Sequence, residues 1–406
     1  MRQVLRSPTV RTAMVMGAAG VGFAGANVIL ARVLPTAQYA LFTLMVALVN
    51  VSHPLAPAGM DGIVNRRQLQ VGPDLLRTTL ITCSLVALGF GILGSLVYDL
   101  SPALLLLLFV STTAGGAMMV AAAQFQSERR FAISLALLQS SNIVILIAGL
   151  AVVLSGVWEA RLPLIIYTFG FVCAATYGWW RLFRERAGKP FQETSFPWSE
   201  ALSYAGLSAA GLLLIQLERL VIPHVLTEHD LATFGVLAAI AGSLFRVLQM
   251  GVGYTLMPRL RAAPDVVHRR QLIAHEAKLV GYIILAGSAV IWFITPLLDR
   301  WFLAGKYHLG GALLIAALVS GVAKVLSAFT KTTAMALITP EELSMLNLLG
   351  WASSALAVGA AVFGGRWGLA GVIYGVALGW LARGTAAFCF TIRHLRLPSA
   401  VPATAP

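Results

Sequence analysis

The chain has 406 residues, of which 58% are hydrophobic and 11% are charged, and its mean hydropathy is +0.83. A soluble protein of this length with so few polar residues could not cover its own surface, so the composition excludes a soluble globular fold. The formal charge of +13 comes without a basic-aromatic patch, a glycine-rich phosphate loop or a zinc-type Cys/His spacing, so we expect no nucleic acid as a partner.

Apolar runs of about twenty residues recur along the chain, and each is long enough to cross a bilayer core of ~30 Å. The sequence therefore predicts an all-α polytopic membrane protein with about twelve transmembrane helices. The predicted spans are 9–33, 38–60, 75–97, 103–124, 132–154, 162–181, 200–222, 231–257, 276–298, 309–331, 342–363 and 368–392. The first run is long and lacks a small-residue cleavage site, so we expect no cleaved signal peptide.

Two stretches of the chain share one layout. Residues 27–50 superpose without a gap on residues 219–242 when the chain is shifted by 192 residues. Both read as an apolar helix, a short polar turn, a small residue, an aromatic residue and a second apolar helix. The matched residues are Val33, Leu34, Ala40, Phe42 and Ala47 with Val225, Leu226, Ala232, Phe234 and Ala239. Twofold internal repetition of this kind is typical of transporters.

Lys and Arg are divided unequally between the two sides of the predicted helices. The N-terminus and the segments after even-numbered spans carry twenty of them, whereas the opposite loops carry five. Because cytoplasmic loops are enriched in Lys and Arg, we expect both termini in the cytoplasm and a multi-pass protein of the inner (plasma) membrane.

The longest polar stretch between spans is 182–198, which contains Gly188, Pro190 and Pro197. It predicts a cytoplasmic linker between an N-terminal six-helix lobe, 1–181, and a C-terminal six-helix lobe, 199–397. The Pro/Ala-rich tail 398–406 is expected to be disordered. No loop is long enough to hold a catalytic domain, so we expect a protein that is not an enzyme and uses no cofactor or metal. The three cysteines lie in apolar runs and are interpreted as core residues.

Short motifs along nearly the whole chain resemble those of the MOP exporter superfamily, in its polysaccharide (O-antigen and exopolysaccharide) flippase branch. The motifs are RVLPTAQYALFTL at 32–44, Gly59-Met60-Asp61 with Arg66, Gln124 with Arg129-Arg130-Phe131, Glu218-Arg219, Met257-Pro258-Arg259-Leu260, Gly305-Lys306-Tyr307 and Trp367-Gly368-Leu369-Ala370-Gly371. The chain departs from the family pattern where Pro35 and Ala40 replace the usual glycines and where Glu218 lengthens the usual aspartate.

The resemblance implies a MATE-like fold of two six-helix bundles that face each other across a central cavity and work by alternating access. It also implies the cargo, a lipid-diphosphate-linked anionic oligosaccharide that is flipped from the cytoplasmic to the outer leaflet for polysaccharide biosynthesis. Membrane lipids and the polysaccharide polymerase and export machinery are then the expected partners.

Charged residues inside predicted spans are the main functional candidates, because a charge within the bilayer is costly and usually faces the protein interior or a wet cavity. Arg246 lies deep in the eighth span, and Gly242, Gln249 and Gly253 share its helix face. A guanidinium on a small polar face is suited to bind an anion, with Gln249 beside it. The alternative is a structural Arg paired with a helix-end carbonyl.

Lys324 and Arg383 lie in spans that run in the same direction as that of Arg246. The three side chains are predicted to form a cationic floor towards the cytoplasm that binds the cargo. Each of the two could instead snorkel to the interface, and snorkelling is favoured for Arg383 because it lies nearer the inner end of its span.

Glu218 and Arg219 lie together in the seventh span. Glu218 is the clearest candidate for a buried carboxylate in the C-terminal half, and hence for proton or sodium coupling, while Arg219 is a further candidate for substrate binding. A structural ion pair is the alternative for both residues.

The sign of the charges inside the spans discriminates between functions. Four basic residues, Arg219, Arg246, Lys324 and Arg383, stand against one acidic residue, Glu218. This favours a phosphate-bearing cargo and hence a flippase. The alternative is a multidrug or toxin cation antiporter of the same superfamily, which would favour carboxylates in the cavity. A membrane polymerase or ligase would be expected to carry a sizeable polar external loop, and a scaffold would have little use for interior charge.

Overall fold

The computed structural model describes residues 8–67, 72–186, 196–263 and 265–396. These residues form helices joined by short turns and contain no β-strand. In chain order the helices are α2 (Pro8–Val33), α3 (Thr36–Leu55), α4 (Met60–Arg67), α5 (Pro73–Tyr98), α6 (Pro102–Ser127), α7 (Phe131–Ser155), α8 (Arg161–Arg186), α9 (Trp198–Val225), α10 (Glu228–Ala262), α11 (Val266–Leu297), the π-helix η1 (Leu298–Phe302), α12 (Gly311–Leu337), α13 (Pro340–Gly364), the 3-10 helix η2 (Gly365–Trp367) and α14 (Gly368–Arg396).

These helices confirm the predicted all-α membrane fold. Each predicted span overlaps one long helix, and the second span runs from α3 to the first residue of α4. Among the described residues, eight helical stretches are long and apolar enough to cross a membrane, or nine if the bent pair α3 and α4 counts as one span. One of the eight stretches, Glu341–Leu395, contains both α13 and α14. The chain is therefore a multi-pass membrane protein.

The helices divide into two compact units, Met1–Ala239 and Ile240–Pro406. The predicted lobes and linker stay a prediction. α8 continues to Arg186, and residues 187–195 of the predicted linker and the tail 398–406 lie outside the described residues.

The internal repeat of the sequence coincides with two helix junctions. α2 ends at Val33 and α3 begins at Thr36, whereas α9 ends at Val225 and α10 begins at Glu228. Both positions of the second junction therefore lie 192 residues after those of the first, which is the shift that relates the two stretches of sequence.

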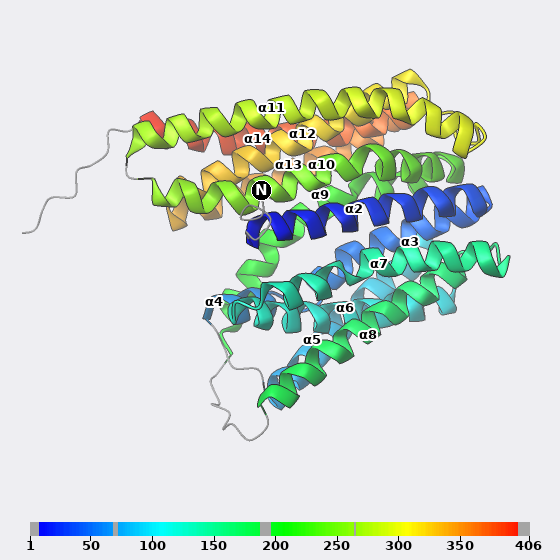
Figure 1. Cartoon of the computed structure of the whole chain (residues 1–406), viewed down its shortest axis with the longest axis horizontal. Coiled ribbons are helices and arrows are strands. Elements are labelled where there is room, and N and C mark those ends of the chain that lie inside the picture. Colours follow the sequence, from blue (N-terminus) through cyan, green and yellow to red (C-terminus); the bar gives the residue numbers. More distant parts are fainter. Residues whose placement is uncertain (1–7, 68–71, 187–195, 264, 397–406) are drawn as a thin grey trace, which may run out of the picture. The chain divides into compact units, whose positions relative to one another are not determined.

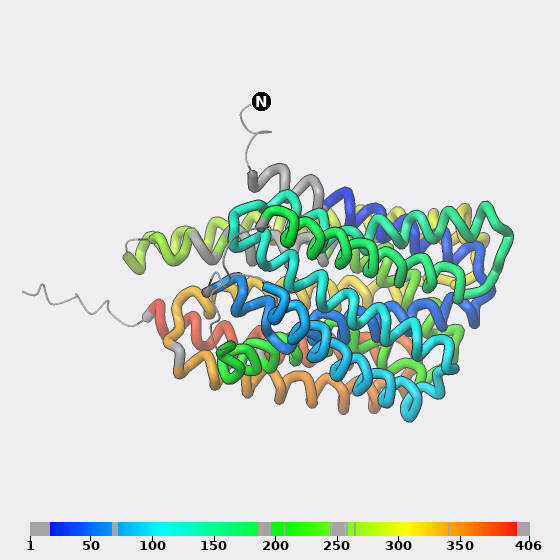
Figure 2. The backbone as a smooth tube through the Cα atoms, turned by 90° about the horizontal axis from the view of Figure 1, so that it is seen from below, coloured from blue at the N-terminus to red at the C-terminus, as the bar shows by residue number. Residues whose placement is uncertain are grey.

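In the first unit, α2 packs along α7, and α6 packs against α5 and α8 (Figure 1). The α5–α6 hairpin, blue to cyan, can be followed in Figure 2. Two glycines of α6 bring this helix close to α3 and α5. A Cβ atom at Gly115 would lie 2.7 Å from His53 Cβ, and one at Gly116 would lie 2.6 Å from Cys83 Sγ. Small residues at such contacts are typical of helix packing in membranes.

The second span bends by 47° between α3 and α4, as its prolines predict. Pro54 lies inside α3, and the break contains Gly59 with a φ of 83°, a conformation that favours glycine. A Cβ atom at Gly59 would lie 2.0 Å from the carbonyl oxygen of Ala201, so the break rests directly on the start of α9. Beyond the break, Arg66 Nη1 donates to Glu200 Oε1 at 2.9 Å.

In the second unit, α14 packs against both α12 and α13 (Figure 1). Gly371, Gly375 and Gly379 form a row at four-residue spacing along α14. A Cβ atom at Gly375 would lie 2.4 Å from the carbonyl oxygen of Ala360, and one at Gly379 would lie 2.4 Å from Ala357 Cβ. The backbones of α13 and α14 are therefore in direct contact along this row, which we call the glycine row.

Candidate functional site

The first unit contains a buried polar centre on α9. Glu218 is 1% exposed and Arg219 is 8% exposed, so both are withdrawn from solvent and lipid. Arg219 Nη1 donates to Gln216 Oε1, one turn earlier on the helix, at 2.8 Å. The structure thus places both residues inside the protein, as expected for charges within a membrane helix.

Three further helices reach the buried polar centre. Tyr39 of α3 is completely buried, and the charge of Arg219 acts on its hydroxyl group. The Tyr39 hydroxyl donates to Asn27 Oδ1 of α2 at 3.5 Å, and Asn27 Nδ2 donates to the carbonyl oxygen of Phe23 at 2.8 Å. A Cβ atom at Gly235 of α10 would lie 3.2 Å from Tyr39 Cε1. Helices α2, α3, α9 and α10 therefore meet at this centre.

A cavity of about 840 Å³ lies at the end of the first unit where α5 passes into α6. Its wall includes Leu41, Leu44, Leu104 and Leu231. The titratable residues around it are Tyr98, Asp99, Glu159, Arg161, His224 and Glu228. An apolar wall with a few polar groups and a volume within roughly 300–1,000 Å³ is typical of small-molecule sites. Three carboxylates against one guanidinium give the cavity an excess of negative charge.

At the edge of this cavity, α5 is joined to α9 through Tyr98. The Tyr98 hydroxyl donates to the carbonyl oxygen of Leu220 at 3.1 Å, and its ring lies 5.0 Å from the ring of His224. Pro223, which has no N–H group to donate, interrupts the hydrogen bonding of α9 at the same level. The cavity and these contacts involve segments distant in sequence, and the sequence analysis did not identify them.

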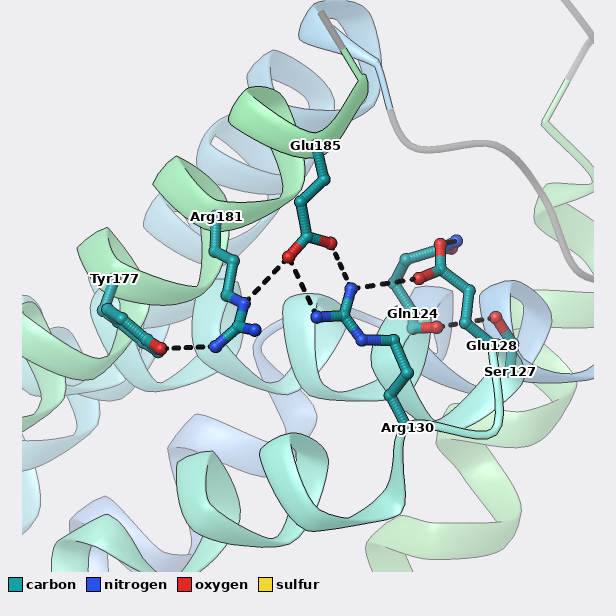
Figure 3. A network of polar contacts seen from close by, with 7 residues as sticks. All are labelled: Gln124, Ser127, Glu128, Arg130, Tyr177, Arg181 and Glu185. Carbon is teal, nitrogen blue, oxygen red and sulfur yellow. Dashed lines mark hydrogen bonds and ion pairs between the residues drawn. The ribbon is translucent and has the colours of Figure 1, made fainter.

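A second polar network lies at the opposite end of α6 (Figure 3). Glu185 of α8 accepts from Arg130 Nη2 at 2.9 Å and from Arg181 Nε at 2.9 Å, and Arg130 Nη1 also contacts its second oxygen. Arg181 Nη1 donates to the Tyr177 hydroxyl at 2.7 Å, and Glu128 lies 3.8 Å from Arg130. The network ties the α6–α7 turn to α8. Its exposed position indicates a structural brace, not a binding site.

In the second unit, the predicted candidate Arg383 is buried and the predicted candidate Lys324 is half-buried. Arg383 stands near the middle of α14 and is 6% exposed, so its side chain does not snorkel as its position in the sequence favoured. Lys324 is half-buried on α12, as is Lys331 two turns further along. Lys331 and Arg383 are close enough for their positive charges to repel one another.

Arg246 and Gln249 belong to α10, but their side chains lie outside the described residues. The cationic floor predicted for Arg246, Lys324 and Arg383 therefore stays a prediction. The sequence does not single out Lys331 as a site residue. It lies at the end of the tenth predicted span, among the twenty Lys and Arg residues that indicate the cytoplasmic side. Its signal was its place on the face of α12 that carries Ser320, Lys324 and Ser327.

Comparison with known proteins identifies the fold family that the chain resembles. No protein-family model matches the chain, and no curated protein sequence matches it. Among solved structures, it resembles an inward-facing multidrug resistance MATE family transporter of the MOP superfamily, with 14% identity and a TM-score of 0.66 over 96% of both chains. It also resembles a eukaryotic MATE transporter, with 13% identity and a TM-score of 0.62 over 95% of this chain and 94% of that chain.

A third similar structure is a MOP superfamily transporter from Pyrococcus furiosus for which a reversed polarity of the binding pocket is described. Its TM-score is 0.53, with 13% identity over 97% of both chains. At these identities the likeness shows the fold alone, which is that of the MATE transporters of the MOP superfamily.

Proposed function

We propose that the chain is an alternating-access transporter of the inner membrane that flips a lipid-diphosphate-linked oligosaccharide to the outer leaflet for polysaccharide biosynthesis. The fold supports transport, and the observation that supports an anionic cargo is the state of Arg383. This cation is buried within α14, and in the described part of the chain it has no hydrogen-bond acceptor and no ion-pair partner. A buried guanidinium of this kind is suited to fork onto phosphate oxygens.

The cargo can be tested in liposomes that contain the purified protein. A fluorescent lipid-diphosphate oligosaccharide should cross from one leaflet to the other, which quenching of the exposed label by dithionite measures. Arg383→Gln should slow this transfer more than tenfold, because it removes a charged contact to the cargo. Arg366→Gln is the matched control, since Arg366 is an exposed cation of the same unit. Equal rates for wild type and empty liposomes would exclude the proposed cargo.

A second candidate is a multidrug cation antiporter, and the comparisons support it better than they support the flippase. A similar structure carries this name, and the acidic cavity of the first unit offers Asp99, Glu159 and Glu228 to a cation. This candidate predicts ethidium efflux that is weakened by Asp99→Asn combined with Glu228→Gln and is unaffected by Arg383→Gln. The opposite pattern of effects would leave the flippase as the function.

We further propose that both termini lie in the cytoplasm and that the protein works beside the polysaccharide polymerase and export machinery. The distribution of Lys and Arg supports the orientation.

A further inference from the structure

The second unit contains a group of buried hydrogen-bond donors where α12, α13 and α14 meet. Arg383 continues the glycine row of α14, four residues after Gly379, and therefore lies on the face that packs against α13. Its Nη2 atom is 3.6 Å from the position that a Cβ atom would take at Gly350 of α13. The guanidinium group therefore lies beside α13 at Gly350, at ordinary contact distance.

α12 brings a second cation to the same place. Two contacts set how α12 and α14 are aligned. A Cβ atom at Gly384 would lie 3.1 Å from Ser327 Cα, and the hydroxyls of Thr333 and Thr391 are 3.2 Å apart. Lys331 stands between these two levels on α12, which explains why its charge and that of Arg383 repel one another.

Two neutral donors lie deeper along the same two helices. Trp380 is one turn before Arg383 on α14, and Ser320 is on the α12 face that carries Lys331. Trp380 is 5% exposed and Ser320 is 3% exposed, yet within the described residues neither Trp380 Nε1 nor Ser320 Oγ has a hydrogen-bond partner. Indole, guanidinium and ammonium groups can only donate. The three groups Lys331, Trp380 and Arg383 we call the donor cluster, whereas Ser320 lies about three helical turns from Lys331 and is not part of it.

Among the described residues, no carboxylate of the second unit is paired with the donor cluster. Its sequence contains five acidic residues. Four of them are engaged elsewhere: Asp265 with His268, Glu276 with Arg259, Asp299 with the backbone N–H of Leu309, and Glu342 with His394. The fifth, Glu341, is exposed. Buried donors that lack acceptors are costly, and a second cation beside the buried Arg383 adds to that cost.

We infer that the donor cluster binds the diphosphate group of an amphiphilic ligand at the junction of α12, α13 and α14. A diphosphate supplies many acceptor oxygens and negative charge, which is what this group of donors lacks. Arg383 would hold the phosphate oxygens with its fork, Lys331 would add a point charge, and Trp380 would add a neutral donor. That the ligand is the transported cargo rests on the proposed function, whereas the anion site does not.

Binding can be measured without transport, as the shift in melting temperature of the purified full-length protein in a neutral detergent. The probe is farnesyl diphosphate, and farnesol is the uncharged comparison. We expect farnesyl diphosphate to raise the melting temperature and farnesol to leave it unchanged. Arg383→Gln and Trp380→Phe should each weaken the apparent affinity, the former more than tenfold. The matched controls are Arg366→Gln and Trp351→Phe, which change exposed residues of the same unit.

Two further probes identify the source of the phosphate. Inorganic pyrophosphate and phosphatidylglycerol are titrated in the same way. Stabilisation by pyrophosphate that Arg383→Gln abolishes would support the anion site and assign it to a free anion. Stabilisation by phosphatidylglycerol that Arg383→Gln abolishes would support it as a site for lipid phosphate. Binding that is unchanged in both Arg383→Gln and Trp380→Phe would overturn the inference, as would the absence of any response of the wild-type protein to all three anions.

The outcome is separable from that of the proposed function. A protein that binds farnesyl diphosphate through Arg383 but flips no oligosaccharide keeps the anion site and loses the proposed cargo. A protein that flips the oligosaccharide while Arg383→Gln and Trp380→Phe bind farnesyl diphosphate normally keeps its function and loses this site.

Discussion

At the scale of single residues, Glu218 is the most informative position in the first unit. Its carboxyl group is almost completely buried inside a membrane helix, beside Arg219 and close to the meeting point of four helices. A buried carboxyl group that gains or loses a proton, or binds a sodium ion, can couple transport to an ion gradient.

Glu218→Gln should therefore abolish the dependence of transport on the driving ion while the protein remains folded, because the amide keeps the shape and loses the titratable charge. The measurement is cargo transfer in liposomes across imposed pH and sodium gradients. Glu341→Gln is the control, since Glu341 is exposed. Unchanged pH and sodium dependence in the Glu218→Gln protein would make Glu218 a structural residue.

Arg246 remains the strongest candidate from the sequence for a phosphate contact in α10. Arg246→Lys keeps the charge and loses the forked geometry, so we expect partial export. Arg246→Ala should lose export while the protein still accumulates in the membrane, because removing one partner of a charged contact costs ~2–5 kcal/mol. Normal export of polymer by a well-expressed Arg246→Ala protein would show that Arg246 does not contact the phosphate of the cargo.

The sequence predicts which charges are buried better than it predicts what surrounds them. Glu218, Arg219 and Arg383 lie within apolar runs. A charged side chain in such a run usually faces the protein interior, because exposing it to lipid is costly. The contact of Arg383 with Gly350 depends on how α14 packs against α13, which is another helix. The contact of Tyr98 with α9 likewise depends on residues more than a hundred positions away, which no local pattern reveals.

At the scale of the elements, the glycine row decides how α13 and α14 pack. The backbone contact at Gly375 leaves no space for a methyl group, because a Cβ atom there would lie 2.4 Å from the carbonyl oxygen of Ala360. Close contact through small residues is what holds membrane helices together where lipid and side chain are equally apolar.

Gly375→Ala should thus lower the stability of the protein by about 1–3 kcal/mol, the usual cost of overpacking. Gly359→Ala is the matched control on α13, because a Cβ atom at Gly359 meets nothing within 4 Å. Thermal unfolding followed by tryptophan fluorescence compares the two. Equal melting temperatures for both variants would show that the row does not determine this packing.

Helix positions follow from the sequence because an apolar run of about twenty residues in a bilayer has one stable solution. The bend after α3 also follows from its prolines. The π-helix η1 does not, since an extra residue in a helical turn leaves no compositional mark. It positions Asp299, whose carboxylate accepts from the N–H of Leu309 and whose carbonyl oxygen accepts from the N–H of Gly305. These contacts shape the turn before α12.

At the scale of the whole molecule, the fold follows from the order of the motifs, and the function does not. The MATE-like architecture was expected from the resemblance and agrees with the solved structures. The choice between an oligosaccharide and a cation depends on which buried charges face the cargo, and this is a property of side-chain packing. Chains with one fold can therefore differ in cargo.

The orientation of the chain gives a further prediction. Cysteines are placed at Gln192 and His229 in a protein without its native cysteines, and intact cells are treated with an impermeant thiol reagent. The Lys and Arg distribution predicts labelling at position 229 and protection at position 192 until the cells are opened. Labelling at position 192 but not at position 229 in intact cells would reverse the orientation.

The position of Arg383 has a consequence for the biogenesis of the protein. An arginine near the centre of a lone helix opposes insertion from the translocon by ~2.5–3.5 kcal/mol. Only the short η2 separates α13 from α14, and Gly350 of α13 contacts the guanidinium group of Arg383. α14 is therefore expected to leave the translocon together with α13, as a hairpin. Because α13 is synthesised before α14, the backbone that contacts Arg383 is already present when Arg383 leaves the ribosome.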